Sequence, residues 1–161
     1  MNVEDVYVLS VIPALTLLPA SMQSIEAQAM LLAIGLQESG LDDRHQDYGP
    51  AHGYWQFEER GGVAGVLRHP LTGSLARDLL NRLDYDSEYV ITSELVHVII
   101  EHNDIVAAAF ARFLLYTVPE RLPGRGEAAM GWQQYLSAWR PGKPHPERWA
   151  GCFAQAWEVV S

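Results

Sequence analysis

The sequence contains a single cysteine, Cys152, in a chain of 161 residues. An intramolecular disulfide bond is therefore excluded, and the fold does not depend on an oxidising compartment. Cys152 lies in a tryptophan-rich segment, where a thiol more often acts as a small buried hydrophobic group than as a nucleophile. We expect a structural role for Cys152.

Basic residues are also scarce. Eleven Lys and Arg stand against twenty Asp and Glu, which gives a formal net charge of −9. This balance disfavours a general attraction to nucleic acid phosphates or to anionic membrane surfaces. The composition therefore predicts no nucleic-acid partner.

Long hydrophobic runs are absent as well. The apolar stretch at residues 6–18 is too short to span a bilayer, and it contains Pro13. It follows Glu4 and Asp5, where a secretory signal would carry Lys or Arg. We expect a packed helix here, with no signal peptide and no membrane insertion, so that the protein stays in the cytoplasm where it is made unless another system carries it.

The apolar residues that are present make up 48% of the chain, enough to bury one core without metals or disulfides. No internal repeat divides the chain, so we expect a single domain over residues 1–161. Helical spacing between clusters of Pro and Gly predicts an all-α fold. The first expected helix begins at residue 21 or 24 and ends at residue 39. The others cover residues 71–83, 87–100, 104–115, 128–139 and 147–159, and a loop or small β-hairpin is expected near residues 48–58.

Glu38 lies on the apolar face of the clearest of these helices, four residues after Ile34 and seven after Leu31. Ser24 is suited to cap the start of this helix and Gly40 to end it. Burial disfavours an ionised carboxylate and raises its pKa, as a general acid near neutral pH requires. The alternative is a solvated Glu38 in a frayed last turn, because Glu is rarely buried unless it is paired.

The sequence Gly53-Tyr54-Trp55-Gln56 follows after a polar loop. Two aromatic rings and an amide in one turn are suited to bind sugars, by stacking on apolar faces and by hydrogen bonds to hydroxyl and acetamido groups. The alternative is that these rings pack in the core.

The order of these features resembles the lytic transglycosylase and goose-type lysozyme group of the lysozyme-like superfamily. In that group a helix ending in Glu-Ser meets a hairpin reading Gly-Leu-Met-Gln or similar. The matching pieces here are Glu38-Ser39 and the sequence 53–56, and the resemblance covers residues 30–58. The residues Pro50-Ala51-His52 replace the Ser and Gly-Ala that precede the hairpin in the group.

Two further segments resemble the group in the same order. Residues 104–114 resemble the helix that packs behind the catalytic Glu, and the sequence Ala-Trp-Arg-Pro-Gly at 138–142 stands where the group has Ala-Tyr-Asn-x-Gly. Trp139 then replaces a tyrosine that hydrogen-bonds near the catalytic acid, and Tyr135 or Tyr116 is a candidate to supply the hydroxyl. Residues 132–144 also resemble segments of uncharacterised bacteriophage and prophage proteins.

The resemblance implies cleavage of the β-1,4 bond between N-acetylmuramic acid and N-acetylglucosamine in peptidoglycan, without a cofactor. Glu38 would act as general acid and then as general base, closing a 1,6-anhydro ring. Hydrolysis stays open as an alternative, because Asp42, Asp43 and Asp47 could supply a second carboxylate. The residues expected to bind substrate are Ser39, Tyr54, Trp55, Gln56, Tyr135 and Trp139.

We expect no metal site. His97, Glu101 and His102 come closest, but a five-residue step between two histidines places them on different faces of a helix. The glycine-rich stretch 61–65 is expected to form a flexible turn beside the cleft.

A non-catalytic reading competes with the enzyme. The protein could be an interaction or structural component of a phage or prophage that keeps a lysozyme-like fold, since fold does not fix function. The acidic composition, the lack of an export signal and the altered segment 138–142 favour this reading, whereas Glu38 on an apolar face favours the enzyme. The expected partners are accordingly glycan strands or virion proteins, and the enzyme would reach the wall as part of a virion or through another delivery system.

Overall fold

The computed structural model describes residues 1–161 and is all-α, with no β-strand. The chain begins with α1 (Val3–Val6), a π-helical turn (Tyr7–Val11) and α2 (Ile12–Thr16), followed by a short 3-10 turn and α3 (Ile25–Ser39). A second π-helical turn (Glu59–Val63) leads into α4 (Ala64–Arg68) and α5 (Gly73–Arg82). The remaining helices are α6 (Ser93–His102), α7 (Asp104–Tyr116), α8 (Ala128–Trp139) and α9 (Pro146–Val160).

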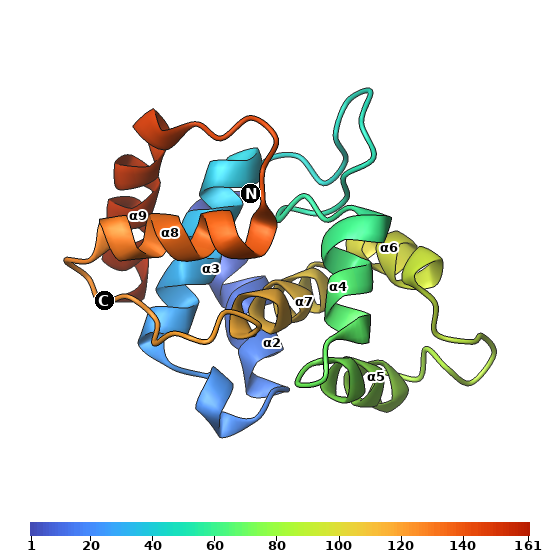
Figure 1. The fold of residues 1–161 in the computed structure, drawn as a ribbon. Coiled ribbons are helices and arrows are strands. Elements are labelled where there is room, and N and C mark those ends of the chain that lie inside the picture. Colours follow the sequence, from blue (N-terminus) through green and yellow to red (C-terminus); the bar gives the residue numbers. More distant parts are fainter.

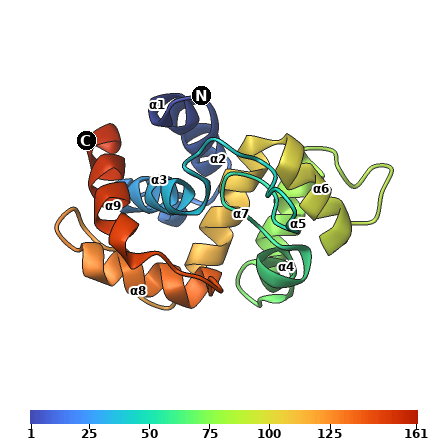
Figure 2. The same cartoon turned by 90° about the horizontal axis from the view of Figure 1, so that it is seen from above.

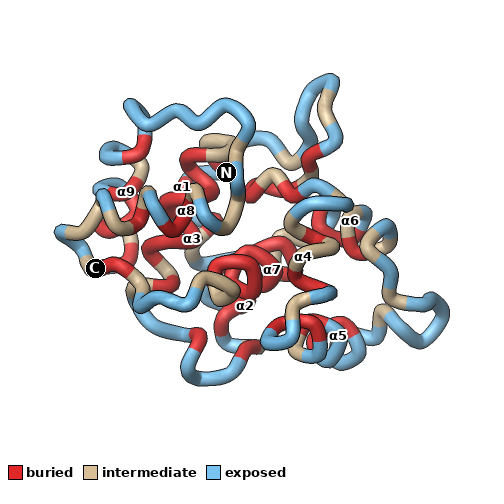
Figure 3. The backbone as a smooth tube through the Cα atoms, viewed as in Figure 1, coloured by how far each residue is buried: buried red, intermediate tan, exposed pale blue.

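The helices form two groups that α7 connects (Figures 1 and 2). In the first group, α3 packs most extensively against α9, and α8 packs against both α7 and α9. The second group contains α4, α5 and α6, on the other side of α7. Helix α7 is the most buried element between them (Figure 3), because its run of Ala and Phe residues is apolar and its one buried charged residue, Arg112, donates a hydrogen bond to the carbonyl oxygen of Met22.

The N-terminal segment packs on α7, as the apolar stretch 6–18 predicts. Val6, Val11, Ala14 and Leu15 are buried there. None of the helices of this protein combines the length and the apolar character needed to cross a membrane.

The boundaries of α3 follow the predicted capping residues. The side chain of Ser24 accepts a hydrogen bond from the backbone N–H of Ala27 at 3.2 Å. At the other end Gly40 adopts a left-handed conformation, with φ at 68°, and its N–H bonds to the carbonyl oxygen of Leu36. Both predictions for this helix are confirmed.

One helix boundary is corrected. The helix expected over residues 87–100 begins only at Ser93, because Thr92 caps it by accepting a hydrogen bond from the N–H of Leu95. Of the two alternatives near residues 48–58 the structure has the loop, in which isolated bridges pair His52 with His45 and with Phe57. The glycine-rich stretch 61–65, expected as a turn, spans the end of the second π-helical turn and the start of α4, with a kink where Gly61 leaves the helical conformation.

Cys152 is partly buried against the core. Desolvation raises the pKa of its thiol, which lowers the thiolate fraction and hence the reactivity. This agrees with the structural role expected for the only cysteine.

Candidate functional site

A groove of about 930 Å³ opens between the two groups of helices. Its walls are the last turn of α3, the segment 56–62, the start and end of α4, the second half of α8 and the loop that leads from α8 into α9. Figure 2 shows α8 and α4, which both contribute residues to the groove, on either side of α7. The groove therefore brings together segments that are distant in the sequence.

Glu38 lies in the wall of this groove, in the last turn of α3. Its carboxyl group is largely withdrawn from water, and this desolvation raises the pKa above the ordinary value of 4.5. The hydrogen bond from Tyr135 and the positive charge of Arg148 act in the opposite direction, and the negative charge of Glu58 adds to the rise. The net effect is a carboxyl group that holds its proton at a higher pH than a solvated Glu.

Tyr135, in α8, donates a hydrogen bond from its hydroxyl to Oε1 of Glu38 at 2.5 Å. The tyrosine ring is itself held by stacking on Trp149, with ring centroids 5.4 Å apart and planes 10° apart. Because Tyr135 donates to Oε1, Oε2 is the oxygen left to carry the acidic proton. Tyr116, the other hydroxyl considered for this position, does not line the groove and instead lies under the guanidinium of Arg112.

Ser39 does not line the groove. Its hydroxyl donates to the carbonyl oxygen of Tyr54 at 2.7 Å and accepts from the N–H of Leu41 at 3.1 Å. Ser39 thus ties the end of α3 to the turn that follows the polar loop. It positions its neighbour Glu38 without facing the groove.

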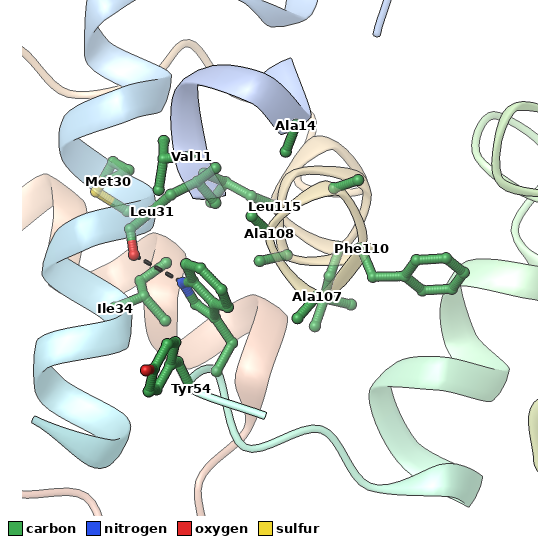
Figure 4. Packing of buried hydrophobic residues seen from close by; sticks show 14 of the residues in the cluster. Val11, Ala14, Met30, Leu31, Ile34, Tyr54, Ala107, Ala108, Phe110 and Leu115 are labelled. Carbon is green, nitrogen blue, oxygen red and sulfur yellow. Dashed lines mark hydrogen bonds between the residues drawn. The ribbon is translucent and has the colours of Figure 1, made fainter. Parts of the chain in front are cut away.

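The aromatic rings of Tyr54 and Trp55 are a correction to the predicted site. Trp55 has an exposed fraction of 0% and Tyr54 of 1%, so neither ring offers a face for stacking on a sugar. The indole N–H of Trp55 donates to the carbonyl oxygen of Leu31 at 2.7 Å, the bond drawn as a dashed line in Figure 4. Tyr54 lies beneath the guanidinium of Arg44, 4.5 Å from the ring centroid.

Gly35 lies where Leu41 and Trp55 pack closely against α3. A Cβ atom at Gly35 would overlap with the end of the Leu41 side chain and would lie 3.3 Å from Nε1 of Trp55. The absence of a side chain at Gly35 therefore makes room for both Leu41 and the indole of Trp55 on this side of the helix.

Gln56 and Trp139 do line the groove, together with Tyr135. Gln56 adopts a left-handed conformation with φ at 51°, and its Nε2 donates to the carbonyl oxygen of Gly53 at 2.9 Å. The indole N–H of Trp139 donates to the carbonyl oxygen of Trp55 at 2.9 Å, which fixes the ring in the wall. Three of the six residues predicted to bind substrate thus line the groove.

The groove concentrates positive charge in an acidic protein. Five of the eleven Lys and Arg side chains line it, against two of the twenty carboxylates. The cations are Arg60, Arg68, Arg140, Lys143 and Arg148, and the carboxylates are Glu38 and Glu58. Clustered charge of one sign attracts a ligand of the opposite sign, even where the net charge of the protein disfavours it.

Glu58 is the groove carboxylate that the sequence did not indicate. The predicted alternatives, Asp42, Asp43 and Asp47, do not line the groove. Glu58 does, because the turn at residues 53–57 carries the chain back along the groove wall. The sequence feature that could have indicated Glu58 is its position two residues after Gln56, a predicted substrate-binding residue.

A cluster of potential metal ligands consists of His45, His52 and Glu101, none of which lines the groove.

Comparison with known proteins gives no family for the chain: no family model matches it, and neither a curated protein nor a solved structure shows significant similarity.

Proposed function

We propose that this protein is a peptidoglycan-cleaving enzyme of lytic transglycosylase type with a lysozyme-like fold, in which Glu38 is the general acid and base. The observation that carries the proposal is the position of Glu38: a desolvated carboxyl group with a raised pKa in the wall of an open groove. A protonated carboxyl of this kind is the group that glycosidic bond cleavage requires.

In the first step Oε2 of Glu38 gives its proton to the oxygen of the β-1,4 bond, and the bond between that oxygen and the muramyl C1 breaks. Glu38 is left as a carboxylate, which the hydroxyl of Tyr135 and the charge of Arg148 stabilise. In the second step the carboxylate accepts the proton of the muramyl 6-hydroxyl as that oxygen bonds to C1. The products are a 1,6-anhydro end and a free 4-hydroxyl, and Glu38 regains its starting proton.

The charge of the groove fits this substrate. Peptidoglycan carries carboxylates on its peptide stems, and the cations of the groove outnumber its carboxylates by five to two. An acidic protein with a basic groove would therefore bind an anionic glycan through the groove alone. Gln56 and Trp139 provide an amide and a ring edge for the sugar units.

Hydrolysis is the second candidate reaction, and Glu58 is the observation that favours it. Its carboxylate lines the same groove, and its charge raises the pKa of Glu38. A second carboxylate near the acid could activate a water molecule against C1. The two reactions then differ in the product end: an anhydro ring in one case and a reducing end in the other.

A non-catalytic interaction protein of a phage or prophage is the competing class of function. The burial of Tyr54 and Trp55 favours it, because it removes two stacking surfaces expected at the substrate. The test is to incubate isolated peptidoglycan with the protein and with the variant Glu38→Gln and to measure the soluble fragments released. Release by the wild type alone supports the enzyme, and no release by either protein under any condition contradicts it.

A further inference from the structure

Three side chains that could bind a metal lie close together beside the loop that connects α3 to the second π-helical turn. His45 and His52 face each other across an isolated bridge in this loop, and Glu101 lies in the last turn of α6. One potential ligand atom from each residue lies within 4.8 Å of the corresponding atom of the other two. Within this cluster Nε2 of His52 lies 3.5 Å from Oε2 of Glu101.

The ring of His52 is held in the orientation that a metal ligand needs. Its Nδ1 lies 2.9 Å from the carbonyl oxygen of His97, and since a carbonyl only accepts, the proton of the neutral ring resides on Nδ1. Nε2 therefore presents its lone pair toward Glu101. A backbone carbonyl that fixes the far nitrogen of a histidine is the usual outer contact of metal-bound imidazole.

The side chain of His97 also contacts the ring of His52. The two imidazoles stack with centroids 3.7 Å apart and planes 2° apart. The Nε2–H of His97 donates to the carbonyl oxygen of Phe57 at 3.0 Å, so its own ring is also fixed. The His52 ring is thus oriented by a hydrogen bond and a stacking contact, both of which come from α6.

We propose that His45, His52 and Glu101 form a binding site for a divalent transition metal ion of the zinc type, with water in the remaining position. Two imidazole nitrogens and one carboxylate oxygen are a ligand set that zinc accepts. In a tetrahedral site with bonds of about 2.0–2.1 Å, neighbouring ligand atoms are about 3.3 Å apart. The His52–Glu101 pair already has nearly this spacing, and the exposed His45 completes the set by rotating its side chain.

The metal would act as a clamp between the loop and α6. The loop already contacts α6 at Gly53, where a Cβ atom would lie 2.8 Å from the side chain of Ile100. The same loop contributes Gln46, Ala51 and Gln56 to the groove. The three ligands come together only in the folded chain, so a bound metal ion would stabilise the folded state over the unfolded one. It would also hold this wall of the groove in place.

The ligands were not recognisable from spacing. The spacing of Glu101 with His97 and His102, its neighbours on the same helix, predicts no metal site. The fold instead combines Glu101 with two histidines that lie more than forty residues earlier in the chain.

The test is to titrate the full-length, untagged and chelator-treated protein with zinc chloride. Calorimetry measures the affinity and the number of ions bound, and thermal unfolding measures the change in melting temperature. Cys152→Ser serves as the background, because it removes the only thiol. The expected result is one zinc ion per chain and a rise in melting temperature. His45→Ala, His52→Ala and Glu101→Gln should each weaken binding by more than about tenfold, the lower limit seen for changes even to outer-shell contacts of metal sites.

His145→Ala is the matched control. His145 is another exposed histidine beside a carboxylate, with its Nδ1 3.3 Å from Glu147, but no third ligand adjoins this pair. Zinc affinity should not change in this variant. Absence of binding by the wild type, or equal affinity in the wild type and in Glu101→Gln, would overturn the site.

Circular dichroism identifies any variant that fails to fold. Glu101→Gln retains the shape of the side chain and keeps the test decisive if His52→Ala unfolds. Cobalt(II) provides an independent readout, because a tetrahedral site gives intense visible absorption. That absorption should be lost in His45→Ala, whose side chain is exposed and whose removal leaves the core intact.

Discussion

The hydroxyl of Tyr135 lies 2.5 Å from Oε1 of Glu38 and joins the middle of α8 to the last turn of α3. The contact connects two residues that are 97 positions apart. It orients the carboxyl group in the groove wall and partly offsets the rise in pKa that burial causes.

Replacing Tyr135 with Phe is expected to raise the pKa of Glu38 further. The variant removes a hydrogen bond that favours the carboxylate, whereas the ring still stacks on Trp149. The alkaline limb of the pH–rate profile, which reports loss of the proton from the acid, should move to higher pH. Stability should fall by only about 1 kcal/mol, the usual worth of one hydrogen bond. An unchanged profile would show that Tyr135 does not act on Glu38.

Replacing Glu38 with Gln is expected to stabilise the protein at neutral pH. Burial raises the pKa of the folded carboxyl above its ordinary 4.5, so the folded state binds this proton more tightly than the unfolded chain. The contribution of Glu38 to stability is fully present below the unfolded pKa and is lost as the pH rises through the folded pKa. Gln does not ionise and avoids this loss.

Urea unfolding at pH 7 and at about pH 3.5, below the unfolded pKa, measures the effect. The variant should exceed the wild type in free energy of unfolding at pH 7, and the excess should shrink at the lower pH. An excess that is the same at both pH values would contradict a buried, titrating Glu38.

Trp55 is expected to contribute to stability and not to glycan contact. Truncating a fully buried Trp to Ala costs about 3–5 kcal/mol, and the variant Trp55→Phe keeps a ring in case Trp55→Ala does not fold. Melting temperature should fall in both, while binding of Trp55→Phe to peptidoglycan at low temperature should match the wild type. Weaker glycan binding at unchanged stability would instead show that the ring of Trp55 contacts the substrate.

The basic groove is expected to control binding to anionic glycan. Arg60 and Lys143 are exposed in the groove, and changing both to Gln should weaken cosedimentation with peptidoglycan and reduce its dependence on salt. Arg125→Gln is the control, because Arg125 is also exposed but lies outside the groove. Equal losses in the control and in the double variant would indicate a non-specific charge effect.

Features that depend on local sequence were predicted well. The spacing of Leu31, Ile34 and Glu38 places the carboxyl on the packed side of one helix, and the caps at Ser24 and Gly40 follow from single residues. The all-α class also follows from local periodicity.

Features that depend on tertiary packing were not predicted from the sequence. The depth of Trp55 depends on its packing against α3, where its indole N–H donates to the carbonyl oxygen of Leu31, twenty-four residues earlier. The hydroxyl at Glu38 comes from Tyr135 of α8, which bonds across the fold to the last turn of α3, and the sequence offered Tyr116 equally. The placement of Glu58 in the groove and of Glu101 beside two loop histidines likewise depends on contacts between distant segments.

The most direct test of the central claim is mass spectrometry of the fragments that the protein and its variant Glu38→Gln release from isolated peptidoglycan. The account predicts muropeptides with 1,6-anhydro ends, lighter by one water than hydrolysis products, and a loss of rate of about 10²–10⁴-fold in the variant, the usual contribution of general acid–base catalysis. Reducing ends that disappear in both Glu38→Gln and Glu58→Gln would assign hydrolysis instead. Fragments released equally by wild type and Glu38→Gln, or by neither, would contradict the catalytic role of Glu38.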